Sequence, residues 1–191
     1  TDSFKILMKK THIYTHLLKG EWIDVARPWD LLDANRILME DIKTDIKGEV
    51  SDRATILGHI QVGKGTRILP GVYIQGPAII GENCEIGPNC YIRPSTCIGE
   101  HCKIGAGVEI KNSIIMNRTN VPHLSYVGDS VIGERCNLGA GTKVANLRRD
   151  EKEVNVVVDG KRTSSGRRKL GVIMGDDVKT GINASIDVGT V

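Results

Sequence analysis

This chain of 191 residues contains few aromatic side chains and no long apolar run. Phe, Trp and Tyr make up 4% of the residues, and only one of them is Phe. The longest apolar stretch is far short of the roughly 18 residues of a membrane span, and no secretory signal is visible, so we expect a cytoplasmic protein with no membrane partner. The net charge of +3 does not indicate nucleic acid as a partner.

Metal-binding motifs and nucleotide loops are also missing. None of the five cysteines stands in a Cys-x-x-Cys spacing, so we expect no metal site. No Gly-rich nucleotide-binding loop is present. Because aromatic side chains are few, the interior of the protein has to be filled by Ile, Val, Ala and Cys.

The chain instead carries a register of six residues. Ten branched aliphatic residues follow one another at this interval: Ile56, Val62, Ile68, Ile74, Ile80, Ile86, Ile92, Ile98, Ile104 and Ile110. A period of six fits neither an α-helix nor an ordinary sheet, and it is typical of a hexapeptide-repeat parallel β-helix. Three hexapeptides close one triangular coil, so equivalent residues of successive coils stack about 4.8 Å apart. The register predicts an all-β solenoid.

The position two before each aliphatic supports this prediction. It is small or β-branched in all ten repeats, as a second inward position in a narrow prism requires. Cys84, Cys90, Cys102 and Cys136 occupy it, so we expect buried, unreactive side chains. A glycine such as Gly81 often follows the aliphatic, and we expect it to provide a positive φ at a corner.

The register lapses twice, and insertions in a solenoid often carry function. Ile110 and Ile132 are 22 residues apart, which is not a multiple of six and predicts a loop insertion near 112–131. A second insertion is expected near 146–171, where EVNVVVDGKRT has the alternation and the Asp-Gly turn of a β-hairpin. The basic residues of this insertion could meet coenzyme phosphates, or the hairpin could simply be solvated or bridge subunits.

Residues 1–46 do not repeat. Pro28 and Asp30 precede apolar residues at helical spacing, which predicts a helix near 28–42. Further upstream, FKILM and THIYTHLLKGEWIDVA predict one or two strands. This region is too short for a domain. We expect it to be the end of another domain, with the β-helix over 47–191 and the whole chain a fragment of a longer protein.

The first insertion contains a candidate catalytic group. His123, Tyr126, Asn137 and Asn146 lie near one another in the sequence. Histidine is the side chain best suited to accept a proton near neutral pH, and an amine that attacks a thioester needs such a base.

The segment PHLSYVGDSVIG, with NLGAGT and a later Asn, resembles the acetyltransferase domain of bifunctional glucosamine-1-phosphate N-acetyltransferase/UDP-N-acetylglucosamine pyrophosphorylases. WIDVARPWDLLDANR is similar to the end of the nucleotidyltransferase domain in archaeal-type sugar-1-phosphate nucleotidyltransferases. The resemblance implies a left-handed β-helix and a homotrimer. It also implies acetyl transfer from acetyl-CoA to the 2-amine of glucosamine-1-phosphate or galactosamine-1-phosphate, in UDP-N-acetylhexosamine synthesis.

The resemblance also implies roles for individual residues. His123 resembles the general base, and Asn146 a residue that orients the amine. The substrate contacts implied are Arg93, Lys111, Tyr126, Asn137 and, by a looser match, Lys152. Ala140 resembles a position along the acetyl-CoA arm, and Gly181 stands at an outer coenzyme contact. The reaction is expected to need no acyl-enzyme and no metal.

Three alternatives remain open. The chain could be an acyltransferase with another acceptor, or a non-catalytic trimerisation tail. A γ-class carbonic anhydrase would need three histidines on zinc, but His59 and His101 are 42 residues apart, which places them on different faces of the prism.

Overall fold

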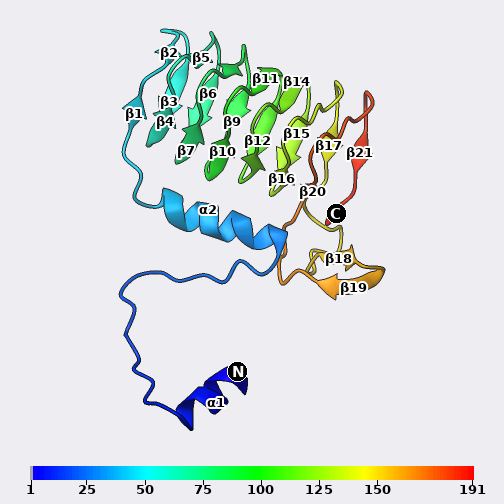
Figure 1. Cartoon of the computed structure of the whole chain (residues 1–191). Helices are drawn as coiled ribbons and strands as arrows, with labels where there is room; N and C mark the ends of the chain where they lie inside the picture. The colour runs from blue at the N-terminus through cyan, green and yellow to red at the C-terminus, as the bar shows by residue number, and fades with distance from the viewer. Residues whose placement is uncertain (1) are drawn as a thin grey trace.

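The computed structural model describes residues 2–191 and contains the parallel β-helix that the six-residue register predicts (Figure 1). Three flat parallel sheets, here called A, B and C, enclose a narrow core. Sheet A contains β1 (Asp45–Ile46), β4 (Ile60–Val62), β7 (Ala78–Ile80), β10 (Thr96–Ile98), β13 (Ile114–Ile115), β16 (Val131–Ile132) and β20 (Ile173–Met174). Sheet B contains β2 (Glu49–Val50), β5 (Arg67–Ile68), β8 (Glu85–Ile86), β11 (Lys103–Ala106) and β14 (Asn120–His123). Sheet C contains β3 (Thr55–Leu57), β6 (Tyr73–Gln75), β9 (Tyr91–Ile92), β12 (Glu109–Lys111), β15 (Tyr126–Gly128), β17 (Lys143–Val144) and β21 (Ser185–Ile186).

The stacking of the repeat aliphatics is confirmed. Ile68 pairs with Ile86, and Ile86 pairs with Ile104, on neighbouring strands of sheet B. These three side chains are at most 2% exposed. The aliphatic register therefore forms columns of buried side chains inside the prism, and their burial is the main stabilising contribution to the fold.

The positive φ predicted for the glycines that follow the aliphatics is found at Gly87, where φ is 102°, but other glycines at this position have a different cause. Gly63, Gly81 and Gly105 do not have positive φ. A Cβ on Gly81 would instead lie 2.7 Å from the carbonyl carbon of Gly99 in the next coil. Residues two positions further along, such as Asn83 with φ of 55°, adopt the left-handed conformation. At Gly63, Gly81 and Gly105, glycine is thus needed because successive coils approach too closely for a side chain.

The prediction of a loop insertion near 112–131 is wrong. These residues form β13, β14, β15 and the first residue of β16, all paired within the three sheets. The buried aliphatics of this stretch are Ile110, Ile115, Val121, Val127 and Ile132, so two of the four steps contain five residues instead of six. Each shortened step lies at the corner from sheet C to sheet A, where a polar residue takes the positive φ: Asn112 at 43° and Asp129 at 51°.

The second interruption is the β-hairpin that the sequence predicts. Strands β18 (Asn155–Val158) and β19 (Lys161–Ser164) pair antiparallel across the Asp-Gly turn. Val154, Val156 and Leu170 of this insertion form a second core with Trp29 and Leu32. The insertion therefore packs against the N-terminal helical segment beside the solenoid (Figure 1).

That segment begins with a 3-10 turn at Pro28–Asp30 and continues as α2 over Leu31–Met39, in agreement with the helix predicted near 28–42. The prediction of one or two strands upstream is wrong. FKILM lies in α1 (Asp2–Met8), where Phe4, Leu7 and Met8 have helical spacing, and residues 11–26 contain no strand. None of the helices among residues 2–191 has the length and apolarity of a membrane span.

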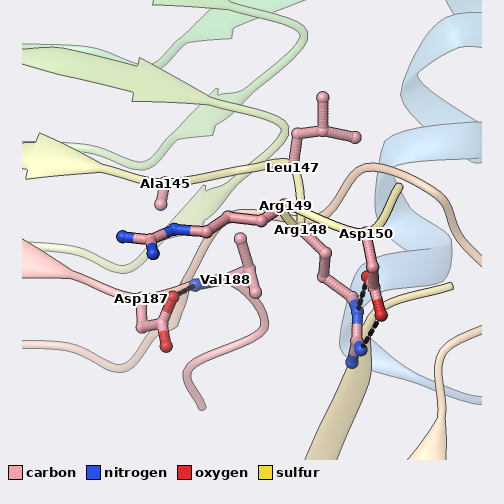
Figure 2. A pocket seen from close by; sticks show the side chains of 7 residues that line it. All are labelled: Ala145, Leu147, Arg148, Arg149, Asp150, Asp187 and Val188. Atoms are coloured by element: carbon pink, nitrogen blue, oxygen red, sulfur yellow. Dashed lines mark hydrogen bonds and ion pairs between the residues drawn. The ribbon is translucent and has the colours of Figure 1, made fainter. Parts of the chain in front are cut away.

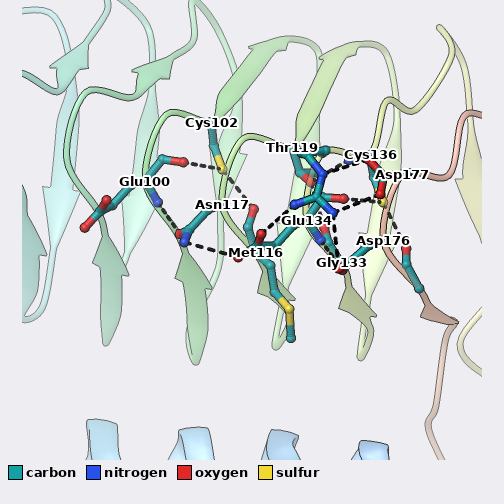
Figure 3. A network of polar contacts seen from close by, with 12 residues as sticks. Glu100, Cys102, Met116, Asn117, Thr119, Gly133, Glu134, Cys136, Asp176 and Asp177 are labelled. Carbon is teal, nitrogen blue, oxygen red and sulfur yellow. Dashed lines mark hydrogen bonds and ion pairs between the residues drawn. The ribbon is translucent and has the colours of Figure 1, made fainter.

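The cysteines of the inward column are buried as predicted, and they also donate hydrogen bonds. Cys102 Sγ donates to the carbonyl of Met116 at 3.1 Å (Figure 3). Cys136 Sγ donates to the carbonyl of Gly175 at 3.1 Å. Thr119, between them in the column, donates from Oγ1 to the carbonyl of Gly133 at 2.7 Å. Each of these side chains therefore donates a hydrogen bond to a backbone carbonyl at a corner of the next coil.

We expect Thr119→Val to destabilise the protein by about 2–3 kcal/mol. Thr119 Oγ1 also accepts the N–H of Cys136 at 3.0 Å, and a buried donor and acceptor left without partners cost about 1–3 kcal/mol each. Thr96→Val is the matched control, because the buried Oγ1 of Thr96 has no hydrogen-bond partner within residues 2–191. Denaturant unfolding should show Thr96→Val to be neutral or stabilising. Equal losses in the two variants would contradict this account.

Candidate functional site

One edge of the prism, the corner from sheet C to sheet A, gathers four of the nine predicted site residues. Arg93 and Lys111 follow the buried aliphatics of β9 and β12, while Asp129 and Asn146 lie just beyond β15 and β17. Because successive strands of sheet C stack, residues distant in sequence become neighbours here. We call the residues at this edge the edge cluster, which consists of Arg93, Glu109, Lys111, Tyr126, Asp129, Asn146 and Lys169.

Tyr126 and Asn146 are joined directly. Asn146 Nδ2 donates to the Tyr126 hydroxyl at 3.2 Å and also donates to a carboxylate oxygen of Asp129. Burial is the main cause that raises the pKa of Tyr126, and the charges of Asp129 and Glu109 raise it further. Tyr126 therefore keeps its proton, and because its oxygen already accepts from Asn146, the hydroxyl is available to donate to a ligand.

The cations of the cluster are only partly neutralised. Arg93 Nη1 lies 2.9 Å from Glu109 Oε1, and this hydrogen bond is the main cause that raises the pKa of Arg93. Its buried Nε has no hydrogen-bond partner within residues 2–191. Burial is the main cause that lowers the pKa of Lys111, whose Nζ is 3.9 Å from Asp129. A bound anion would stabilise the charged form of this lysine.

Lys169, one of the basic residues of the second insertion, completes the cluster, and no local sequence pattern indicates this position for it. The end of the second insertion returns to the edge, where the N–H of Leu170 donates to the carbonyl of Asn146 at 3.0 Å. Leu147 and Lys169 form an isolated antiparallel β-bridge there. Lys169 lies close enough to lower the pKa of Lys111 further. Lys152 is exposed, and its backbone N–H donates to Asp150 at 3.3 Å. Its role stays a prediction, and Lys169 is the better-placed cation.

His123 lies at a different corner of the same prism. It ends β14 in sheet B, and its carbonyl accepts the N–H of Gly141 at 3.1 Å, so it stacks beside Ala140 in the next coil. Gly181 belongs to the coil after that, where it faces Gly139. The imidazole of His123 is exposed and makes no hydrogen bond or ion pair with residues 2–191. The predicted base and coenzyme positions thus share one corner, and β15 separates them from Asn146.

Asn137 is not part of either group. It is exposed in the column of Asn120 and Lys179 on sheet B, and its backbone N–H donates to Val178 at 2.9 Å. A single chain therefore does not bring Asn137 to the edge cluster.

A cavity of about 640 Å³ continues from this edge beyond Asn146. It is lined by Ala145, Leu147, Arg148, Arg149, Asp150, Asp187 and Val188. Figure 2 shows Arg148 turned to Asp150, with which it forms a two-pronged ion pair, whereas Arg149 extends the other way along the cavity. Several other basic residues of the insertion are likewise paired with acids, including Arg167 with Asp33 and Arg168 with Glu151.

The described part of the chain contains no group of three or more His, Cys, Asp or Glu side chains placed to hold a metal ion. His59 lies between β3 and β4, His101 between β10 and β11, and His123 at the end of β14. These are three different corners of the prism, so His59, His101 and His123 of one chain do not form a three-histidine site of the carbonic anhydrase kind.

The fold and this edge define the class, a hexapeptide-repeat parallel β-helix with a cationic, amide-bearing site at one corner. The model of the GMPPB C-terminal domain family matches residues 74–191, and the chain belongs to that family. It is 49% identical over 189 residues to the bifunctional protein GlmU of Methanocaldococcus jannaschii, covering 99% of this chain and 46% of that protein.

A second relative is the bifunctional sugar-1-phosphate nucleotidylyltransferase/acetyltransferase of Sulfurisphaera tokodaii, which is 48% identical over 187 residues, 97% of this chain and 47% of that protein. The chain thus spans about half the length of both relatives, and the resemblance predicted from sequence is confirmed. A solved hexapeptide transferase family protein from Anaplasma phagocytophilum aligns with a TM-score of 0.41 at 14% identity, over 74% of this chain and 70% of that one. The family membership is shown by the match of the family model over residues 74–191.

Proposed function

We propose that this chain transfers an acetyl group from acetyl-CoA to the 2-amine of an amino-sugar 1-phosphate. The acceptor would be glucosamine-1-phosphate or galactosamine-1-phosphate, and the product would serve UDP-N-acetylhexosamine synthesis. The names of the two relatives, one of which includes acetyltransferase, support the reaction type. The enzyme would act in the cytoplasm, where its five unpaired thiols stay reduced.

The observation that carries the proposal is the three-cation group of Arg93, Lys111 and Lys169 beside Tyr126 and Asn146. A sugar 1-phosphate offers a dianion and hydroxyls, which match guanidinium, ammonium and phenol donors. The unpartnered Nε of Arg93 and the lowered pKa of Lys111 both favour a bound anion. These features support a phosphate subsite at the edge.

In the proposed reaction the 2-amine attacks the thioester carbonyl carbon. A C–N bond forms, the C–S bond breaks, and coenzyme A leaves as the thiol. His123 accepts the proton that the amine loses and can return it to the departing sulfur. Positioning of the two substrates contributes the rest of the rate, and a backbone N–H near Ala140 would stabilise the oxyanion.

We propose that a complete site needs two chains. His123 and Ala140 lie at the corner between sheets B and C, while Asn146 and the cations lie at the corner between sheets C and A. In a homotrimer of parallel prisms, one chain can present its His123 corner to the edge cluster of its neighbour. A dissociated chain is then expected to be inactive.

The direct test is a thiol-release assay with acetyl-CoA and each of the two amino-sugar 1-phosphates. Release that depends on either acceptor supports the proposal. Release only with an unphosphorylated amine or a hydroxyl acceptor would replace it with another acyltransferase function. No release with any acceptor by the assembled protein would favour a non-catalytic trimerisation role.

Lys169→Ala is expected to raise the KM for the sugar phosphate about tenfold, equivalent to about 1.4 kcal/mol, because a charge-assisted phosphate contact is lost. Lys152→Ala is the control, since its exposed side chain lies outside the edge cluster, and its KM should change less than about twofold. Initial-rate kinetics with varied acceptor would measure both. The reverse ranking would restore Lys152 as the phosphate contact.

A further inference from the structure

Asp129 is a buried acid that the proposed reaction does not yet use. Asp129 is 4% exposed and lies at a corner of the prism, where its backbone φ is 51°. A buried carboxylate is costly unless it is paired and hydrogen-bonded, so its surroundings indicate what it holds in place.

Asp129 accepts hydrogen bonds from two asparagine side chains. Asn112 Nδ2 donates to Oδ1 at 2.7 Å, and Asn146 Nδ2 donates to Oδ2. Lys111 Nζ lies 3.9 Å from Oδ2, and the backbone carbonyl of Asp129 accepts the N–H of Gly171 at 2.8 Å. The carboxylate of Asp129 therefore joins the two shortened corners to Asn146 at the beginning of the insertion, and its backbone carbonyl contacts the end of the insertion.

This arrangement fixes the direction of the Asn146 amide. An ionised carboxylate can only accept hydrogen bonds, so the NH₂ group of Asn146 must face Asp129. The same NH₂ group donates to the Tyr126 hydroxyl. Asn146 Oδ1 is thereby left as an acceptor for a ligand N–H, while Tyr126 is left as a donor.

We infer that Asp129 is a positioning residue, which holds the Asn146 amide so that its Oδ1 accepts a hydrogen bond from the amine of the acceptor. This inference rests on the proposed function for its substrate. An amine held through one N–H by Oδ1 keeps its lone pair directed away from that oxygen and toward the thioester. Reversal of the amide would place an NH₂ group against the amine and disfavour this orientation.

Asp129→Asn is the informative substitution, because asparagine has the same shape and tolerates the left-handed backbone. The new side chain has its own NH₂ group and no longer requires the Asn146 NH₂ to face it. We expect kcat to fall about 10- to 100-fold, as a small misplacement of reacting groups does. The KM for the sugar phosphate should stay the same or decrease, because a negative charge beside Lys111 has been removed.

Asp177→Asn is the matched control. Asp177 also has a positive φ, of 62°, at a corner, but it is exposed and pairs with Arg135 at 2.7 Å, away from the edge cluster. The kcat and KM of the Asp177→Asn variant should differ from those of the wild type by less than about twofold. Asp129→Asn with near-normal kcat would overturn the inference, and so would a parallel rise of KM and loss of thermal stability, which indicate a structural role.

A second measurement separates this inference from the proposed function. In protein labelled with ¹⁵N-asparagine, the side-chain NH₂ of Asn146, assigned with an Asn146→Asp variant, should exchange slowly with solvent. Asp129→Asn should accelerate that exchange, whereas Asp177→Asn should not. If the wild-type protein acetylates no amino-sugar phosphate, the proposed function fails, and the exchange result still decides whether Asp129 holds the amide. Fast exchange in the wild type would overturn the inference whatever the activity.

Discussion

His123→Ala is expected to reduce acetyl transfer by about 100-fold or more, because the base that accepts the amine proton is lost. The imidazole is exposed at the end of β14, beside the corner of Ala140, so its removal leaves no buried cavity. The KM for the sugar phosphate should change little, since the phosphate contacts lie on a different edge. Thiol-release kinetics would measure both parameters.

His59→Ala provides the comparison for this variant. His59 is also exposed, at another corner, where Nδ1 lies 3.2 Å from the Thr44 hydroxyl, and its loss should leave the rate nearly unchanged. Added imidazole should restore part of the activity of His123→Ala, as an external base replaces the missing one. Near-normal turnover in His123→Ala would remove His123 from the proposed mechanism.

Gly105→Ala is expected to destabilise the protein by about 3 kcal/mol, at the upper end for an overpacked interior site. A Cβ at this position would overlap the Pro122 carbonyl, with the carbonyl carbon only 2.7 Å away. Both residues belong to backbone that is paired between coils, so neither can move without breaking the β11–β14 pairing. The coils would have to separate locally, which thermal or denaturant unfolding would detect.

Gly175→Ala isolates this effect from the general influence of glycine replacement. A Cβ on Gly175 meets no atom within 4 Å, and its φ is not positive. Alanine there should stabilise the protein slightly, by about 0.5 kcal/mol, because the unfolded chain loses freedom. Both variants must be compared at the same protein concentration, since association adds to apparent stability. Equal effects of the two substitutions would contradict the close-approach explanation.

The hairpin of the second insertion could be predicted from the sequence, but the place where the insertion packs could not. The alternation and Asp-Gly turn of EVNVVVDGKRT predict β18 and β19, because hairpin pairing depends on neighbouring residues. The return of Lys169 to the side of Lys111 depends on Val154, Val156 and Leu170 packing on Trp29 and Leu32. That contact spans more than a hundred residues of sequence and has no local signal.

The distance of 22 residues between Ile110 and Ile132 was read correctly from the sequence, but the loop predicted from it is wrong. This number is not a multiple of six, which favoured a loop. The chain instead shortens two corners, at Asn112 and Asp129, and keeps every strand in its sheet. A loop insertion and two shortened corners would contain the same number of residues, so only the pairing of the strands from β13 to β16 distinguishes them. The shortened corners bring Asn112 and Asp129 within hydrogen-bond distance.

The sequence by itself determined the parallel β-helix, its buried columns and the approximate position of α2, because these follow from side-chain periodicity and local capping. It also indicated most of the candidate site residues through their resemblance to a known family. Only the tertiary structure decided which of them meet. It placed Arg93, Lys111, Tyr126 and Asn146 on one edge with Asp129 and Lys169, and it placed His123 on another corner. The physical reason is that stacking of coils, corner lengths and the path of an insertion depend on contacts between residues far apart in sequence.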